Sequence, residues 1–363
     1  MKHLFKLRNT LLLIAIATIS FSCSDDDSDP VIPTSNYSQE LTNIANNVIV
    51  ETYKDLANKA ADLHNEAIDI KTNITASNLD NARQAWRSAR EPWEKSEGFL
   101  FGPVDSQGID PAIDSWPVNI VDMDNLLSNT SGFPTITENI ISNQTNEAKG
   151  FHLIEYLLWG IDGNKQVADF TSRELEYLVA ACANLKTKTT ELYDAWKSNG
   201  GNHVANFLNA GGTGSIYVSQ KSALEDLVDG MITIADEVGN GKIETPFNGE
   251  NGAGFDPTQE ESRFSHNSKL DFANNVRSIS NVYNGKFTID GKGISDIVAE
   301  SNTTLDETFK AQILEAVEAI EAIPGTFTDA ISNNRTSVAT AQSKVRIVQE
   351  TLETLIKPLI VNL

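Results

Sequence analysis

Cysteines, basic side chains and long apolar runs are scarce in this sequence of 363 residues. It contains two cysteines, Cys23 and Cys182, so a disulfide-stapled fold is excluded and stability must come from one or two hydrophobic cores. Cys182 lies in EYLVAACANL, where we expect a small, buried, apolar residue. Lysine and arginine together number 28 against 50 acidic residues, which gives a formal net charge of -22. A surface of that sign repels phosphate backbones, so no nucleic acid is expected as a partner.

One long apolar run stands at the N-terminus. Residues 1–22 join a basic start, MKHLFKLRNT, to LLLIAIATISFS, which is typical of a secretory signal and too short to span a membrane. Cys23 follows directly, at the place where bacterial lipoproteins are acylated, and the next residues, SDDDSD, resemble the surface-export tag of Bacteroidetes lipoproteins. We therefore expect a cell-envelope, outer-membrane lipoprotein, anchored through Cys23 and displayed at the surface. The alternative is a plain signal peptide followed by a chance cysteine.

Strand-like alternation is also scarce, and helical periodicity takes its place. Between residues 41 and 56, apolar side chains recur at steps of three and four. Thr171 with Glu174, and Ser77 with Asp80, have the spacing of capping boxes that begin helices. The best candidate for a short hairpin arm is KFTID, from Lys286 to Asp290. The sequence therefore predicts an all-α fold.

Two irregular stretches, at residues 198–215 and 239–257, interrupt the helical pattern. The first follows about four predicted helices and precedes a similar number, so we place a domain boundary beside it. The predicted parts are an acidic, proline-containing tether and two four-helix-bundle-like domains. Their ranges are 23–37 for the tether, 38–205 for the N-terminal bundle and 206–363 for the C-terminal bundle.

A polar pair stands inside the apolar stretch GFHLIEYLLWG, residues 150–160. His152 and Glu155 are three residues apart, so on a helix they share one face. An imidazole and a carboxylate side by side can bind one transition-metal ion. The alternative is a core histidine with satisfied hydrogen bonds beside a glutamate that reaches for solvent. The spacing alone is a weak signal.

Four separated motifs resemble the imelysin-like family of bacterial envelope proteins. The hallmark of that family, G-x-H-x-x-E, is matched by Gly150, His152 and Glu155. The other three motifs are RQAWRSAREPWEKSEGFLFGP at 83–103, IDSWP at 113–117 and ESRFSHNSKLDF at 261–272. The resemblance covers nearly all of the predicted mature chain.

The resemblance implies two helical bundles with a cleft between them that contains the histidine–glutamate motif. It also implies metal chemistry of two kinds. The family is classed as metallopeptidases after a member described as cleaving insulin, whereas other members look like iron-regulated envelope proteins or the periplasmic subunit of an iron importer.

Four residues are the candidate metal ligands: His152, Glu155, Glu97 and His266. Glu97 lies in mostly apolar company, where an unpaired carboxylate is costly, so its alternative role is an ion pair. The alternative for His266 is an exposed loop histidine. Other motif residues are expected to line the cleft, with core packing, capping or ion pairing as the alternatives: Arg83, Arg90, Trp86, Trp93, Asp114, Trp116, Gly150, Glu261, Ser262, Ser265 and Asn267.

The expected function is metal binding in iron uptake or handling, alone or with an envelope transport system. Carboxylate and imidazole ligands suit iron, which we favour over zinc as the bound ion. A zinc metallopeptidase of the imelysin type is the alternative. The sequence contains no second acidic motif that indicates a general base, so the catalytic set is incomplete. A third interpretation is a non-enzymatic module that binds haem, a peptide or a glycan in the same cleft.

Overall fold

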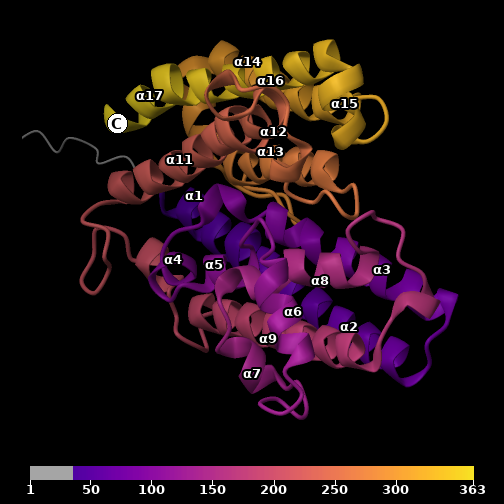
Figure 1. Cartoon of the computed structure of the whole chain (residues 1–363). Helices are drawn as coiled ribbons and strands as arrows, with labels where there is room; N and C mark the ends of the chain where they lie inside the picture. The colour runs from indigo at the N-terminus through magenta and orange to yellow at the C-terminus, as the bar shows by residue number, and fades with distance from the viewer. Residues whose placement is uncertain (1–35) are drawn as a thin grey trace, which may run out of the picture. The chain divides into compact units, whose positions relative to one another are not determined.

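The first half of the described chain packs around four helices (Figure 1). The structure is a computed structural model that describes residues 36–363, so the predicted signal, Cys23 and nearly all of the predicted tether lie outside the described residues. Helix α2 packs against α3 and α9, and α8 packs against the same two helices. Their bounds are α2 (Glu51–Thr72), α3 (Ala76–Glu94), α8 (Gly150–Trp159) and α9 (Ser172–Trp196).

The starts of these helices test the capping predictions. Helix α9 begins with the capping box of Thr171 and Glu174, as predicted. Helix α3 begins after Thr75, whose hydroxyl accepts the amide of Asn78, so the prediction of a start at Ser77 is wrong. Thr75 has an extended backbone and presents its hydroxyl two residues earlier, and Ser77 is already inside the helix.

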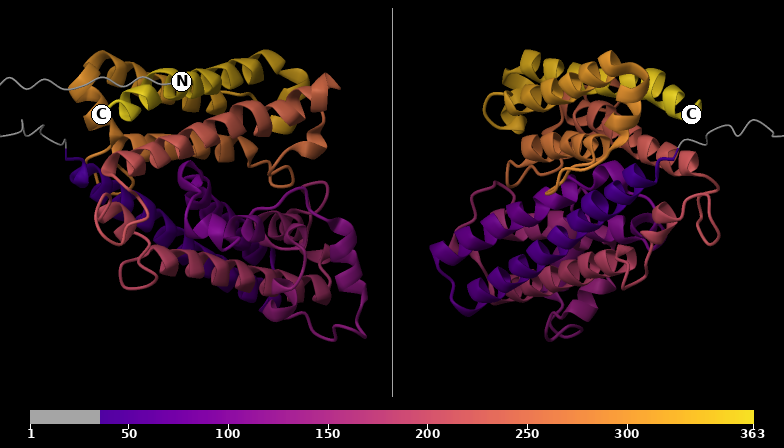
Figure 2. Two further views of the ribbon diagram at one scale, coloured as in Figure 1. Left: turned by 90° about the vertical axis from the view of Figure 1, so that its left-hand side faces the viewer. Right: turned by 180° about the vertical axis from the view of Figure 1, so that it is seen from behind.

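A second ring of four helices forms from the other half of the chain, and the views of Figure 2 show it stacked on the first. Helix α13 packs against α11 and α14, and α16 packs against the same two. Their bounds are α11 (Gln220–Asp236), α13 (Ser268–Asn284), α14 (Ile294–Glu321) and α16 (Arg335–Thr351). All residues from 36 to 363 form one compact unit, and the division at 205/206 stays a prediction.

The two rings touch at a 3-10 turn, Glu97–Phe99, which follows α3 and packs against α11 and α13. The backbone of Gly98 passes so close to the second ring that a Cβ there would lie 2.8 Å from the hydroxyl of Ser278. A Cβ at Gly230 would in turn overlap the carbonyl oxygen of Gly98. Glycine at these positions therefore lets the backbones of the two halves approach directly.

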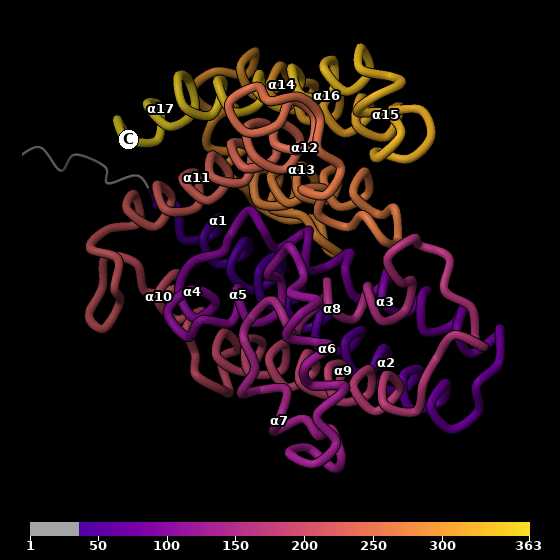
Figure 3. The backbone as a smooth tube through the Cα atoms, in the orientation of Figure 1, coloured from indigo at the N-terminus to yellow at the C-terminus, as the bar shows by residue number. Residues whose placement is uncertain are grey.

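Short helices and turns complete the described chain, and the tube of Figure 3 shows the long connections between them. The short helices are α1 (Ser38–Asn43), α4 (Pro103–Ser106), α5 (Ile109–Ile113), α6 (Ile120–Ser128), α7 (Glu138–Ser142), α10 (Ala205–Leu208), α12 (Glu244–Asn248), α15 (Phe327–Asn333) and α17 (Lys357–Val361). Segments with π-helical hydrogen bonding are Ile44–Val50, Glu237–Lys242 and Leu352–Ile356. Further 3-10 turns are Asn146–Ala148, Val167–Asp169, Glu250–Gly252 and Pro257–Gln259.

The all-α prediction is confirmed, since no strand forms anywhere in residues 36–363. The predicted hairpin arm is reduced to a single bridge between Lys286 and Asp290, so that prediction is wrong. Cys182 is fully buried, as predicted. Within the same residues, no helix combines the length and the apolarity needed to cross a bilayer.

Candidate metal-binding site

The first turn of α8 is held against the segment that carries Asp114. Gly150 has a φ of +78°, and a Cβ there would overlap the carbonyl oxygen of Ile113. Because only glycine adopts this conformation without strain and leaves room for that carbonyl, α8 can begin beside Asp114. His152 follows Gly150 by two residues on α8. This contact places its imidazole 3.1 Å from the Asp114 carboxylate.

His152 is buried among charged groups. Its Nε2 lies 3.1 Å from Oδ1 of Asp114, and its Nδ1 lies 3.4 Å from Oε2 of Glu155. Burial and the nearby Arg90 lower the pKa of His152, but its hydrogen bonds to Asp114 and Glu155 outweigh them and raise that pKa to about 9. At neutral pH the side chain is therefore an imidazolium, with a proton on each ring nitrogen. A metal ion would have to displace one of these protons.

Asp114 accepts hydrogen bonds from two side chains of α3. Its Oδ1 accepts from the guanidinium of Arg90, and its Oδ2 accepts from the indole of Trp93 at 2.6 Å. Burial favours the neutral acid, but Arg90 and His152 hold the pKa of Asp114 well below its usual range. Asp114 is therefore an ionised carboxylate with a fixed orientation, which suits a metal ligand.

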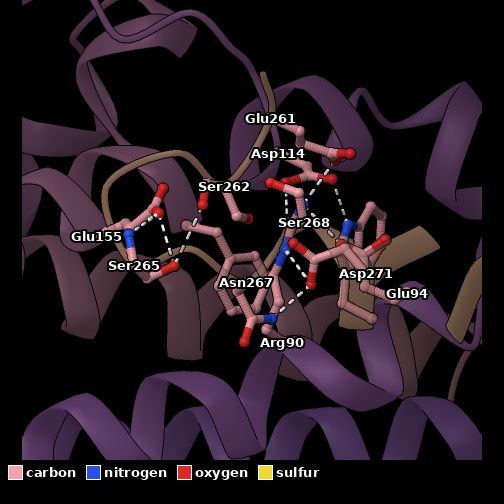
Figure 4. Close-up of polar contacts among 12 residues, drawn as sticks. Arg90, Glu94, Asp114, Glu155, Glu261, Ser262, Ser265, Asn267, Ser268 and Asp271 are labelled. Carbon is pink, nitrogen blue, oxygen red and sulfur yellow. Dashed lines mark hydrogen bonds and ion pairs between the residues drawn. The ribbon is translucent and has the colours of Figure 1, made fainter. Parts of the chain in front are cut away.

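Arg90 is fully buried at the centre of the acidic cluster (Figure 4). Its Nη2 lies 2.6 Å from Glu94 and 2.7 Å from Glu261, and its Nε lies 3.7 Å from Asp271. One guanidinium thereby joins carboxylates from both halves of the chain.

Lys242 is the second buried cation of the cluster, at the end of the π-helical segment Glu237–Lys242. Its Nζ lies 3.0 Å from Glu97, 3.1 Å from Glu261 and 3.9 Å from Glu94. Glu261 therefore binds Arg90 and Lys242 through the same oxygen, Oε1.

Carboxyl groups outnumber cationic groups in this buried cluster. The buried carboxyl groups are Glu94, Glu97, Asp114, Glu155, Glu261 and Asp271, and the groups that oppose them are Arg90, Lys242 and His152. Burial raises the pKa values of Glu94 and Glu97 well above the usual range, and it raises that of Asp271 to about 6. The cluster thus retains protons that a cation could replace.

Two sets of side chains could hold a metal ion. The ligand atoms of Asp114, His152 and Glu261 all lie within 4.8 Å of one another, and so do those of a second set, Glu94, Glu97, Asp114 and Glu261. Oε2 of Glu261 and Oδ2 of Asp271 are buried without a hydrogen-bond partner. One imidazole and several carboxylates form a donor set that fits iron or zinc.

The cluster opens to a pocket of about 520 Å³. Glu97, Asp114 and Lys242 line it on the side of the cluster. Trp116 lines another wall, and the remaining walls include Glu237, from the second half of the chain. Of the candidate ligands, Glu97 and Asp114 therefore face the pocket.

The family of the chain follows from comparison with known proteins. The Imelysin (Peptidase_M75) family model matches residues 49–355. The chain belongs to the imelysin family. It is 30% identical over 329 residues to Iron-regulated protein A of Synechococcus elongatus, a match that covers 89% of this chain and 86% of that protein.

Two solved structures resemble this imelysin-family chain. One is a putative iron-regulated protein A precursor from Parabacteroides distasonis, with a TM-score of 0.78 and 26% identity. The other is an imelysin-like protein from Psychrobacter arcticum, with a TM-score of 0.69 and 14% identity, which shows the fold alone. Each match covers 88% of this chain and 94% of the other.

The candidate ligands predicted from the imelysin-like motifs do not come together as one set. His152 and Glu155 lie side by side, but Oε1 of Glu155 accepts from the amide and the hydroxyl of Ser265, both at 2.7 Å. Glu97 lies with Lys242 instead, because the ammonium attracts its carboxylate. His266 is exposed in a turn with a φ of +56° and is not among the groups that surround His152.

The predicted cleft residues fall into two groups. Trp86 is fully buried and its indole donates to the carbonyl of Phe151, so it belongs to the core. Arg83 donates to backbone carbonyls at Leu158 and Lys165 and supports the end of α8.

The remaining cleft residues lie at or beside the cluster. Trp116 is partly exposed and lies 5.9 Å from the ring of His152. Asn267 donates to Asp271 at 2.7 Å, and the hydroxyl of Ser262 is buried without a partner. Three cluster residues were not predicted: Glu94, Lys242 and Asp271. Glu94 follows Arg90 by one turn, which is a recognisable ion-pair spacing, whereas nothing in the sequence around Lys242 marks it.

Proposed function

We propose that this imelysin-family protein binds a metal ion, with iron favoured, through Asp114, His152 and Glu261, as part of iron uptake or handling in the cell envelope. The observation that carries the proposal is the convergence of these three buried donors within 4.8 Å, with Asp114 also lining the pocket. The iron-regulated relatives support iron as the ion.

The side chains around the three donors would act as a supporting shell. Arg90 binds both Asp114 and Glu261, so it fixes the positions of two ligands that are far apart in the sequence. Such supporting groups commonly change metal affinity by about 10- to 100-fold. The metal ion would be the cargo of the protein, and holding it requires no chemical reaction.

The envelope location belongs to the same proposal. It depends on the signal sequence of residues 1–22 and on acylation of Cys23, both of which lie outside the described residues. A lipid-anchored protein with an acidic surface would hold its metal site close to the membrane across which iron must pass.

Titration calorimetry of metal-stripped protein with Fe(II), Fe(III) and Zn(II) tests the proposal. We expect one ion per chain, bound more tightly for iron than for zinc. Asp114→Asn and His152→Ala should each weaken binding by more than about 100-fold, since loss of a ligand exceeds loss of a supporting group.

A buried carboxylate remote from the cluster provides the control. Asp306 accepts a hydrogen bond from Tyr283 at 3.0 Å and lies in the second ring of helices. Asp306→Asn should retain the affinity of the unmodified protein. Absence of binding in the unmodified protein, or equal affinities in all variants, contradicts the proposed function.

A further inference from the structure

A long uncharged segment connects α9 to α11. Residues 198–220 contain no aspartate, glutamate, lysine or arginine, although 21% of the whole chain is charged. The segment includes α10 and the loop 209–219, which projects from the fold in Figure 1. In a protein of net charge -22, 23 consecutive residues without a charged side chain are a distinct stretch of sequence.

The loop 209–219 presents apolar side chains to the outside. Val218 is 89% exposed and Ile216 is 64% exposed, whereas Tyr217 between them is buried. Leu208, at the end of α10, is also exposed. A single exposed valine needs no explanation, but three exposed aliphatic residues within eleven positions of one uncharged segment are a concentration of apolar surface. We call Leu208, Ile216 and Val218 the apolar patch.

Internal contacts hold this patch in place. The ring of Tyr217 packs 4.8 Å from that of Phe207, and its hydroxyl donates to Asp226 at 2.6 Å. The hydroxyl of Ser215 donates to the carbonyl of Asn206, also at 2.6 Å. Because Tyr217 is anchored inward, the alternation of side chains keeps Ile216 and Val218 pointing outward.

The first described residues lie beside the patch. The amide of Tyr37 donates to the side chain of Gln220 at 2.7 Å, and the side chain of Gln220 donates to that of Asn36 at 3.2 Å. Gln220 follows Val218 by two residues. The chain that leads back to Cys23 therefore leaves the described fold next to the apolar patch.

The length of that chain limits how far the patch can lie from a lipid on Cys23. Asn36 follows Cys23 by 13 positions in the sequence. Even a fully extended chain spans at most about 3.3–3.6 Å per residue, or roughly 45 Å here. A short connection of this kind gives the patch a high effective concentration at the bilayer.

We propose that the apolar patch contacts the phospholipid bilayer to which Cys23 anchors the protein. The proposal rests on the predicted acylation of Cys23 and is independent of the metal site. Uncharged aliphatic side chains enter the boundary between headgroups and acyl chains without the cost of desolvating a charge. The lipid anchor and the patch together then fix which side of the protein faces the membrane, a role that a single lipid anchor cannot fill.

The test uses the full mature, lipidated chain in phosphatidylcholine vesicles. Val218→Cys is labelled with an environment-sensitive fluorophore, and Cys182 is buried and so protected from the label. Val121→Cys is the matched control, because Val121 is 69% exposed and lies on α6. Both substitutions are at exposed positions and leave the core unchanged.

The label at position 218 should shift to the blue and be quenched about twofold or more by lipids that carry a quencher, whereas the label at 121 should not respond. The signal at 218 should disappear at the same lipid concentration in a Cys23→Ser protein. Equal responses at 218 and 121 overturn the proposal, as does an unacylated Cys23 in mass spectrometry. A blue shift that appears without vesicles and grows with protein concentration also overturns it, because a second copy of the chain would then cover the patch.

Discussion

Ser265 donates both its backbone amide and its hydroxyl to one oxygen of Glu155, at 2.7 Å in each case. Glu155 belongs to α8 in the first ring of helices, and Ser265 belongs to the turn before α13 in the second. The same turn carries Glu261. The glutamate of the G-x-H-x-x-E motif thus brings Glu261 toward His152, and we infer a positioning role for it.

Removal of this contact should lower the stability of the fold more than it weakens metal binding. Glu155→Ala leaves the Ser265 amide without its acceptor and should lower the free energy of unfolding by about 1–3 kcal/mol. Glu155→Gln keeps an acceptor oxygen and should lower it less. Guanidinium denaturation measures both changes, and calorimetry should show that Glu155→Gln still binds metal. If Glu155→Gln abolishes binding as Asp114→Asn does, Glu155 is a ligand and the positioning role is wrong.

The carboxylates of the pocket should accelerate arrival of the cation. Asp110 and Glu237 line the pocket from the two halves of the chain. The double variant Asp110→Asn/Glu237→Gln should slow metal association about tenfold at low salt, because local negative potential raises the association rate of cations. Stopped-flow measurements should show the difference shrinking as salt increases.

Asp62→Asn/Glu66→Gln is the control for that experiment. It makes the same change in net charge at a different pocket, of about 490 Å³, between α2 and α3. Its association rate should stay near that of the unmodified protein. Equal slowing by both double variants would show that total charge acts, and not the carboxylates of this pocket.

Glu260 should make stability depend on pH. Its carboxyl accepts from the hydroxyls of Ser268 and Thr328, both at 2.6 Å, but burial raises its pKa to about 7. The folded state therefore favours the protonated form. Its contribution to stability is fully present below the ordinary glutamate pKa of 4.5 and is lost as the pH rises through 7.

Glu260→Gln should remove this dependence. From about pH 4.5 to 8, the free energy of unfolding of the unmodified protein should fall by up to about 3 kcal/mol more than that of the variant. Denaturant unfolding at several pH values measures the difference. Glu250→Gln, at an exposed position ten residues before Glu260, should follow the unmodified protein. Parallel curves for Glu260→Gln and the unmodified protein would contradict the assignment.

Gly150→Ala should be strongly destabilising, because it combines backbone strain with an overlap against the Ile113 carbonyl. We expect a loss of about 3 kcal/mol or more in the free energy of unfolding. Gly108→Ala separates the two causes, since Gly108 has a φ of +61° with nothing within 4 Å of its Cβ position. That variant should lose only about 1–2 kcal/mol. If both variants lose a similar amount of free energy of unfolding, backbone strain explains the whole effect and the overlap with the Ile113 carbonyl contributes nothing.

Local signals in the sequence predicted local structure. The capping box at Thr171 and the burial of Cys182 depend on near neighbours and were predicted correctly. The side-by-side placement of His152 and Glu155 follows from helical spacing and is also present.

The candidate ligand set depends on contacts between distant parts of the chain, and sequence spacing does not encode these contacts. Glu261 is 171 residues from Arg90, and Lys242 is 145 residues from Glu97. Family motifs indicated that Glu261 belongs to the cleft, but not which carboxylates would bind the two cations. His266 stands in a family motif, yet its side chain is exposed to solvent, in line with the alternative of an exposed loop histidine.

The position of Lys242 between Glu97 and Glu261 would make cation uptake under the proposed function an exchange reaction. The buried carboxylates already have an ammonium and a guanidinium as counterions. The negative charge of the cluster is therefore partly neutralised in the protein without metal. Under the proposed function, an arriving ion competes with an internal cation or a proton for the same oxygens. Part of its binding energy is used to displace that competitor, which limits affinity and allows the ion to be released again. Reversible release is what a carrier needs and a permanent cofactor site does not.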